Sequence, residues 1–381
     1  MAYWPGGTKL RGVNIYQRKV YPELDGNVYM GKGFIGPPYI QEDFDRLSAL
    51  GANYVIISHP GIFTEDFPYH PEEVIQNLNV ILDRVENADM FAVISFRTGP
   101  GRSEFTFFWD EVGDWVGANY LNHNVWKDPE AQATWADMWR YTAELYRDNP
   151  IVLGYDLMVE PNANEVGIDV LEDNLDIFDP HYFYVSYEDT MYDWNQFYPK
   201  IVESIRTVDQ ETPILVGGMG YSAINWLPYL RPVNDDRILY MVHQYDPYDY
   251  THQKPHGRKV VYPEDVQQEY LEGLIDTMIS YSENYQVPVA CNEFGAVRWS
   301  PGGYQYLDDL MGLFDQQGYN HAIWVWHPLL EPYNQKVHAF NFRTGSGPKH
   351  WEDNPHNDLL RIIQKYWARN TCRPSQPILM H

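Results

Sequence analysis

The stretch VLGYDLMVEP at residues 152–161 decides how the chain folds. An apolar run of strand length occupies most of it, and that run ends at an acidic side chain, Glu160. An amphipathic helix pattern precedes it at residues 128–147, and another follows at 192–208. A strand set between two such helices is typical of βαβ units, whose strands lie parallel in one sheet.

The same alternation continues along the whole chain. Apolar runs of strand length are expected at residues 10–15, 52–58, 91–96, 152–159, 213–216, 238–243, 287–292 and 321–326. Helix patterns lie at 39–50, 71–88, 128–147, 192–208, 263–284 and 303–317, while the segment between the fifth and sixth runs is short and irregular. No repeat, low-complexity tract or linker interrupts the series. Residues 1–381 are therefore expected to form one domain, an α/β fold of the (β/α)8 TIM-barrel type with long aromatic-rich loops.

Composition argues against several classes of protein. Lys and Arg number 27 against 53 Asp and Glu, which gives a net charge of −26 that repels phosphate backbones, so a nucleic acid is not the expected partner. No apolar run approaches the roughly 18 residues of a membrane-spanning helix, and no membrane partner is expected. Aromatic residues make up 16% of the chain, and exposed aromatic faces suit sugar rings, although a Tyr-rich core explains the same count.

The two cysteines and the first residues of the chain are compatible with two cellular compartments. Cys291 lies in a strand-like run and Cys372 in the polar C-terminal tail, so no disulfide framework is indicated. Residues 1–7 lack the basic and apolar regions of a signal peptide. The sequence is compatible with a cytoplasmic protein and with a secreted one whose signal has been removed.

Two glutamates stand where apolar strand runs end. Glu160 closes the fourth run and Glu293 the seventh, and the C-terminal ends of these strands face each other across a barrel mouth. Retaining glycoside hydrolysis needs such a pair: one carboxylate attacks the anomeric carbon while the other protonates the leaving oxygen and later deprotonates water. The alternative is that each glutamate only pairs with a nearby cation, which two matching positions make the weaker interpretation.

Aromatic residues are concentrated in the long segments that follow the third, fourth and sixth strands. Examples are residues 105–109, which include Trp109, and residues 245–250. In a barrel these segments line the C-terminal face, where chemistry occurs. Trp109 is therefore expected to contact a substrate.

Six short motifs, in order along the chain, resemble those of the cellulase-type glycoside hydrolases of family 5, one of the clan A families. The motifs are RGVN at 11–14, RTGPG at 97–101, VEP at 159–161, HQY at 243–245, NEFG at 292–295 and WVW at 324–326. The resemblance covers most of the chain. It implies a (β/α)8 barrel that hydrolyses a β-glycosidic bond by double displacement, without a cofactor.

The resemblance also implies roles for individual residues. Glu160 corresponds to the acid/base and Glu293 to the nucleophile. His243 would contact the acid/base region, and Tyr245 would donate its hydroxyl toward the nucleophile. Trp326 would form the platform under the sugar at the cleavage point, with Trp324 one layer deeper in the barrel.

Two positions depart from the pattern of this family. Val159 stands where the family has an Asn that hydrogen-bonds the sugar 2-hydroxyl, and Ser58 stands where it has a strand-two Arg that supports the nucleophile. Arg97, in place of the strand-three His, is expected to restore that positive charge. His59, next to Ser58, is expected on the substrate side.

The combined prediction is a retaining β-glycosidase acting on a β-linked polysaccharide or oligosaccharide. A metal is not expected, because the spacing of His243, His252 and His256 matches no compact ligand pattern. Two alternatives remain: a carbohydrate-binding barrel with weakened catalysis, and a transglycosylase that uses the same site. The sugar, its linkage, endo or exo action and the oligomeric state stay open.

Overall fold

The computed structural model describes residues 1–19, 21, 35–36, 39–64, 71–111, 113–114, 117–163, 178–329 and 335–378, with backbone only at 108–111 and 335–337. Eight parallel strands form a closed barrel in the order β1-β10-β9-β8-β7-β6-β5-β4. They are β1 (Arg11–Tyr16), β4 (Tyr54–His59), β5 (Phe91–Phe96), β6 (Val152–Asp156), β7 (Ile214–Gly217), β8 (Ile238–Gln244), β9 (Val289–Phe294) and β10 (His321–Trp326). The predicted (β/α)8 barrel is confirmed.

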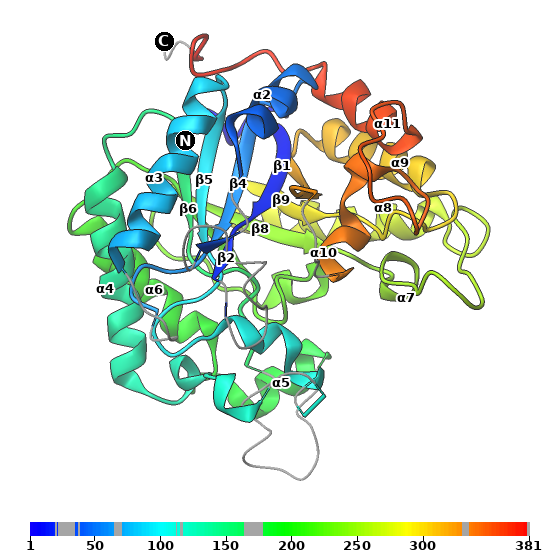
Figure 1. Cartoon of the computed structure of the whole chain (residues 1–381). Helices are drawn as coiled ribbons and strands as arrows, with labels where there is room; N and C mark the ends of the chain where they lie inside the picture. Colours follow the sequence, from blue (N-terminus) through cyan, green and yellow to red (C-terminus); the bar gives the residue numbers. More distant parts are fainter. Residues whose placement is uncertain are drawn as a thin grey trace.

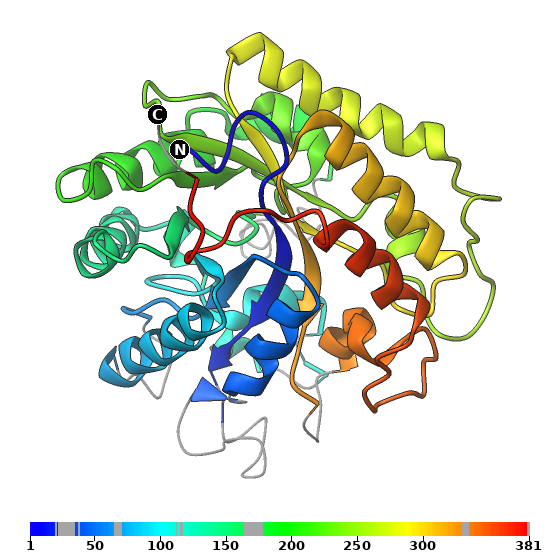
Figure 2. The ribbon, with the colours of Figure 1, turned by 90° about the horizontal axis from the view of Figure 1, so that it is seen from above.

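Helices surround the barrel, and the view from above in Figure 2 shows them as an outer ring around the strands. The longer ones are α2 (Gln41–Ala49), α3 (Pro71–Asn87), α4 (Pro129–Tyr146), α6 (Trp194–Arg206), α8 (Gln268–Tyr285), α9 (Gly303–Gln317) and α11 (Asp358–Trp367). Shorter ones are α5 (Pro180–Tyr187), α7 (Tyr248–Thr251) and α10 (Gln335–Phe340). The predicted irregular segment between β7 and β8 contains the 3-10 helix Ile224–Tyr229. Helix α11 was not among the predicted helices.

Side chains alternate between the two faces of each strand, as the period of two requires. In β8, Leu239 and Met241 belong to the cluster inside the barrel, whereas Tyr240 and Val242 pack in the larger cluster shared with the helices. Trp4 belongs to the interior cluster, where its indole nitrogen donates a hydrogen bond to the Leu153 carbonyl over 3.1 Å. The barrel is therefore a packed core and not a pore.

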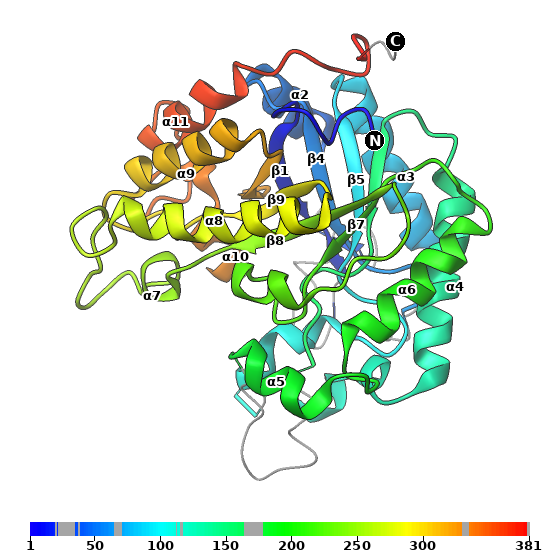
Figure 3. The same cartoon turned by 180° about the vertical axis from the view of Figure 1, so that it is seen from behind.

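The two ends of the barrel have different roles. At the N-terminal ends of the strands lie the first residues of the chain and the last segment that the structure describes (Figure 1). The backbone nitrogen of Ile378 donates a hydrogen bond to the Tyr3 hydroxyl. Helix α5 and the long loops gather at the opposite end (Figure 3). Within the described residues, no helix has the length and apolar character needed to cross a membrane.

Polar side chains replace the apolar interior toward the C-terminal ends of the strands. The set is almost fully buried and comprises Asn14, Ser58, Ser95, Asp156 and Asn292. Within it, the Ser95 hydroxyl donates a hydrogen bond of 2.6 Å to Asp156. The mouth of the barrel above this layer is therefore the place where charged groups can be held with partners.

Candidate active site

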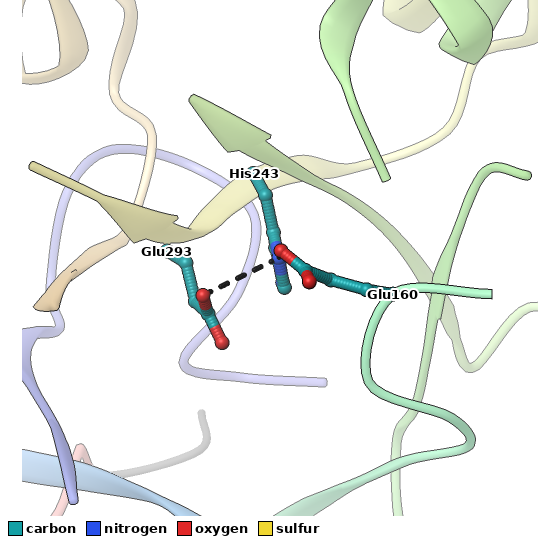
Figure 4. Close-up of side chains that lie close together, drawn as sticks. All are labelled: Glu160, His243 and Glu293. Atoms are coloured by element: carbon teal, nitrogen blue, oxygen red, sulfur yellow. Dashed lines mark hydrogen bonds and ion pairs between the residues drawn. The ribbon is translucent and has the colours of Figure 1, made fainter. Parts of the chain in front are cut away.

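Three strands bring Glu160, His243 and Glu293 together at the C-terminal mouth (Figure 4). His243 lies near the end of β8 and Glu293 near the end of β9, while Glu160 follows β6 by four residues. The His243 Nδ1 atom is 3.0 Å from a Glu160 oxygen and 3.5 Å from a Glu293 oxygen. One oxygen of each carboxyl and this nitrogen all lie within 4.8 Å of one another, so the two predicted glutamates do converge.

A β-bulge in β9 turns Glu293 toward the mouth. Val242 of β8 is paired with Cys291, but the next residue, His243, is paired with Glu293, so β9 has one extra residue at Asn292. Cys291 and Phe294 both face the helices, which strict alternation would not allow for residues three apart. Bulges near active sites often redirect a side chain in this way.

Tyr245 also reaches the Glu293 carboxylate. Its hydroxyl lies 3.1 Å from Glu293 Oε2, and its ring packs against His252 and Phe340. Burial and the negative charge of Glu293 raise the pKa of Tyr245 well above its ordinary value. The hydroxyl therefore keeps its proton and donates a hydrogen bond to the Glu293 carboxylate, which is the contact that the resemblance implied.

The charges in the mouth hold the two carboxyls in different states. Burial lowers the pKa of His243, but Glu293 and Glu160 outweigh burial and raise it to about 9. Burial raises the pKa of Glu160, yet the adjacent His243, together with Arg97 and Arg102, lowers it below the ordinary value. Burial and the charge of Glu160 raise the pKa of Glu293 to about 7 against the opposing charge of His243. The pair titrates as a unit, and it holds about one proton between the lowered pKa of Glu160 and the pKa of Glu293 at about 7.

Arg97 supplies a second cation at this mouth, as predicted from its position after β5. Its guanidinium carbon lies 3.8 Å from the centre of the Phe107 ring and 4.8 Å from that of Tyr16. Its Nε atom is 3.2 Å from Glu104, and Glu104 also accepts a short hydrogen bond from the Tyr16 hydroxyl. Burial lowers the pKa of Arg97, but Tyr16, Glu104 and the two carboxyls of the mouth raise it above the ordinary value, so the group stays charged.

The structure exchanges the predicted roles of the two tryptophans of β10. Trp326 is fully buried on the helix side, where its ring lies against Phe342, Arg46 and Arg343, so it is not a platform for a sugar. Trp324 is partly exposed and packs 5.8 Å from Tyr16 in the mouth.

The physical reason is an irregular register on β10. Val13 of β1 pairs with Ile323 and Ile15 pairs with Trp326, so β10 has one residue more than β1 over this span. Because the extra residue switches the face of everything after it, Trp326 points outward although Trp324 points inward.

Two other predicted contacts differ from expectation. His59 is fully buried and faces the helices, where its Nε2 atom lies 2.9 Å from Asn77 of α3, so the prediction that it meets substrate is wrong. The alternation in β4 explains this, because Ser58 points inward and its neighbour must point outward. The side chain of Trp109 lies outside the described residues, and its role stays a prediction. Tyr16, Glu104 and Arg102 are mouth residues that the sequence did not reveal.

The site has to be compared with a metal centre, because the ligand-type atoms of Glu160, His243 and Glu293 are close enough to hold an ion. A metal requires neutral imidazole. Here the pKa of His243 is raised to about 9, so at neutral pH the ring is protonated, donates a hydrogen bond to Glu160 and forms an ion pair with Glu293. The three groups are better described as an ion-paired carboxylate dyad than as a ligand set.

Fold and site together define a class of protein: a (β/α)8 barrel with a buried pair of carboxylates at its C-terminal mouth. Comparison with known proteins identifies the family within that class. The chain belongs to the cellulase family, glycosyl hydrolase family 5, whose model matches residues 21–329.

Individual relatives are distant. Endoglucanase C of Acetivibrio thermocellus is 22% identical over 255 residues, which cover 57% of this chain and 66% of that protein. The match thus spans just under two thirds of the relative's own length. Thermotoga maritima Cel5A, solved in complex with cellobiose in a mutant form and with mannotriose, has a TM-score of 0.63 and 17% identity in both structures. These alignments cover 93% of this chain and 96% and 97% of the two solved chains, and at this identity they support the fold alone.

Proposed function

We propose that this chain is a retaining glycoside hydrolase that cleaves β-linked glucan chains, with Glu293 as nucleophile and Glu160 as general acid and base. The observation that carries the proposal is the approach of the two carboxyls to within 4.8 Å. Retaining enzymes hold their carboxyls about 5 to 5.5 Å apart, whereas inverting enzymes need about 6.5 to 9.5 Å to admit a water molecule. The spacing supports double displacement.

In the first step, an oxygen of Glu293 forms a bond to the anomeric carbon as the bond from that carbon to the leaving oxygen breaks. The proton of Glu160 passes to the leaving oxygen, and the first sugar product departs. In the second step, Glu160 takes a proton from water, the water oxygen bonds to the anomeric carbon, and the ester to Glu293 breaks. Both carboxyls return to their initial states.

The first of these two reaction steps needs the shared proton on Glu160, although in the free site that proton lies mainly on Glu293. His243 contacts both carboxyls and the pair titrates as a unit, so the proton can be redistributed within it. Positive charge develops at the anomeric carbon in the transition state, and that charge favours ionised Glu293 directly beside it. The transition state therefore favours the form of the pair in which the proton is on Glu160.

The family and its endoglucanase relatives support a β-glucan as substrate. The partly exposed Trp324 offers an aromatic surface next to the carboxyls. Val159 is almost fully buried and carries no polar side chain for a sugar 2-hydroxyl. We infer that the cation of Arg97, in the same mouth, supplies polar contacts to the sugar that other members of the family make differently.

The test is hydrolysis of a panel of aryl β-glycosides and β-linked glucans and mannans by the wild type, Glu160→Gln and Glu293→Gln. Asp315→Asn, which alters a buried ion pair with Arg11 outside the mouth, is the matched control. We expect both Gln variants to lose activity at least 1000-fold on the polysaccharides and on glycosides with a poor leaving group such as phenol. The control should keep its activity, and proton NMR should show the β-anomer as the first product.

Each of the other outcomes would indicate a different mechanism or activity. An α-anomer as first product would contradict the retaining mechanism. Products elongated by an acceptor sugar would identify a transglycosylase. Sugar binding without turnover on any substrate would identify a binding barrel.

A further inference from the structure

A buried arginine outside the dyad holds the main chain that carries Glu160. Arg102 is 2% exposed, and its guanidinium donates two hydrogen bonds to successive carbonyls, those of Val159 at 2.6 Å and Glu160 at 2.8 Å. A longer bond of 3.3 Å reaches the carbonyl of Arg97 at the end of β5. The planar guanidinium of Arg102, called the fork below, therefore connects the ends of two neighbouring strands by hydrogen bonds.

The conformation of Glu160 explains why two carbonyls can share one guanidinium. Its φ is 52°, in the left-handed region that residues with a Cβ rarely adopt. Successive carbonyls alternate in direction along an extended strand, but they point to the same side in a helical conformation of either hand. Such a conformation costs free energy and persists at functional sites only when the surrounding structure enforces it.

A tight turn fixes the position of Arg102 itself. The backbone groups of Gly99 and Arg102 bond each other in both directions, at 3.0 and 2.9 Å, around Pro100 and Gly101. Pro at the second position and Gly at the third, here with φ of 69°, are typical of a type II turn. A Cβ on Gly101 would lie 2.5 Å from the backbone of Val125, so the turn is also closely packed.

The side chain of Arg102 is held on its other side by an aromatic ring. Its guanidinium carbon lies 4.8 Å from the centre of the Phe107 ring, which also contacts Arg97. Turn, ring and carbonyls together fix the fork at one place.

We propose that Arg102 is a positioning residue: it keeps Glu160 in its left-handed conformation and so aims the proposed acid/base carboxyl at the leaving oxygen. This inference rests on the proposed function of Glu160. Arg102 touches backbone carbonyls and not the reacting atoms, so its loss should misplace the proton donor and leave the nucleophile in place.

The experiment compares two aryl β-glycosides of the sugar that the wild type cleaves. Phenol is a poor leaving group that needs the proton of Glu160, whereas 2,4-dinitrophenol leaves without it. In Arg102→Lys and Arg102→Gln we expect kcat/KM to fall about 100-fold for the phenyl glycoside and less than about threefold for the dinitrophenyl glycoside. Lysine keeps the charge but cannot form the fork, so it should not rescue.

The matched control is Arg206→Lys. Arg206 also donates two hydrogen bonds to carbonyls, those of Asp209 and Thr212, both at 3.0 Å, but between α6 and β7 at the other end of the barrel. Its ratio of the two kcat/KM values should match the wild type.

An equal loss on both glycosides, or no loss on either, would overturn the positioning role. So would failure of both Arg102 variants to fold, because Arg102 would then be a structural residue. Glu160→Gln separates this inference from the proposed function. If Glu160→Gln keeps phenyl glycoside activity, the acid/base assignment fails; if only Glu160→Gln shows the leaving-group dependence, the inference about Arg102 fails.

Discussion

Replacing Tyr245 by Phe should slow the proposed reaction by an amount that the site itself defines. The substitution removes only the hydroxyl that lies 3.1 Å from Glu293 and keeps the ring packed on His252 and Phe340. A hydrogen bond to a charged group contributes about 1.5 to 3 kcal/mol. In the free site the shared proton lies mainly on Glu293, so the active form, with Glu293 ionised, is the minor one. The full contribution therefore appears in kcat/KM, as a loss of about 10- to 150-fold.

The pH dependence distinguishes this cause from general damage. A dinitrophenyl glycoside does not need the acid, so for that substrate any form with ionised Glu293 is active. Since the pKa of Glu293 is about 7 and the hydroxyl lowers it, the loss in Tyr245→Phe should be large at pH 5. The loss should shrink as the pH rises above the increased pKa of the variant. A loss that is equal from pH 5 to 9, or smaller than about threefold at pH 5, would refute the reasoning.

Tyr155→Phe is the matched control for this substitution. The Tyr155 hydroxyl also bonds a carboxylate, Asp209, at 3.0 Å, but it lies on the helix side of the barrel. We expect a small loss of stability and unchanged kcat/KM at every pH.

Three further predictions follow from the mouth and the core. Trp326→Ala should lower the free energy of unfolding by about 3 to 5 kcal/mol. Trp324→Ala should instead lower kcat/KM with little change in Tm. The reverse pattern would mean that Trp326 is the sugar platform, as the sequence predicted. Arg97→Ala should lower kcat/KM about 10- to 100-fold, with partial recovery in Arg97→Lys, and full activity in Arg97→Ala would contradict the role of its charge. Burial lowers the pKa of His321 to about 4, so its contribution to stability is complete above pH 6.5 and is lost as the pH falls toward 4. His321→Phe should remove about 3 kcal/mol of this acid sensitivity in urea unfolding, and an unchanged slope against pH would argue against it.

The sequence predicted the strands and both glutamates because those features depend on local pattern. When apolar runs of strand length alternate with helix patterns, the runs are expected to form the strands of one parallel sheet. A closed parallel barrel then places the C-terminal end of every strand at one mouth. Glu160 and Glu293 therefore converge whatever the details of the loops. The approach of their carboxyl oxygens to within 4.8 Å is a tertiary property that no local pattern contains.

The two tryptophans of β10 were misplaced because of a departure from regular alternation, whereas His59 follows the regular alternation of β4. The bulges at Asn292 and between Ile323 and Trp326 change which face a side chain takes, and neither has a composition signal in a run of apolar residues. The φ of Glu160 is likewise a tertiary result, since it depends on a turn some 60 residues earlier. Helix α11 is different: its buried residues recur with helical spacing at Leu359, Leu360, Ile363 and Trp367, so the pattern was present in the sequence.

The meeting of the two chain ends behind the barrel has a practical consequence. Residues Tyr3 and Ile378 are hydrogen-bonded to each other at the end of the barrel opposite the mouth that holds Glu160 and Glu293. A tag, a carrier protein or a solid support attached at either end would therefore present the mouth outward. If the proposed glucan substrate is correct, an immobilised preparation should accept long or insoluble chains as readily as the free protein does.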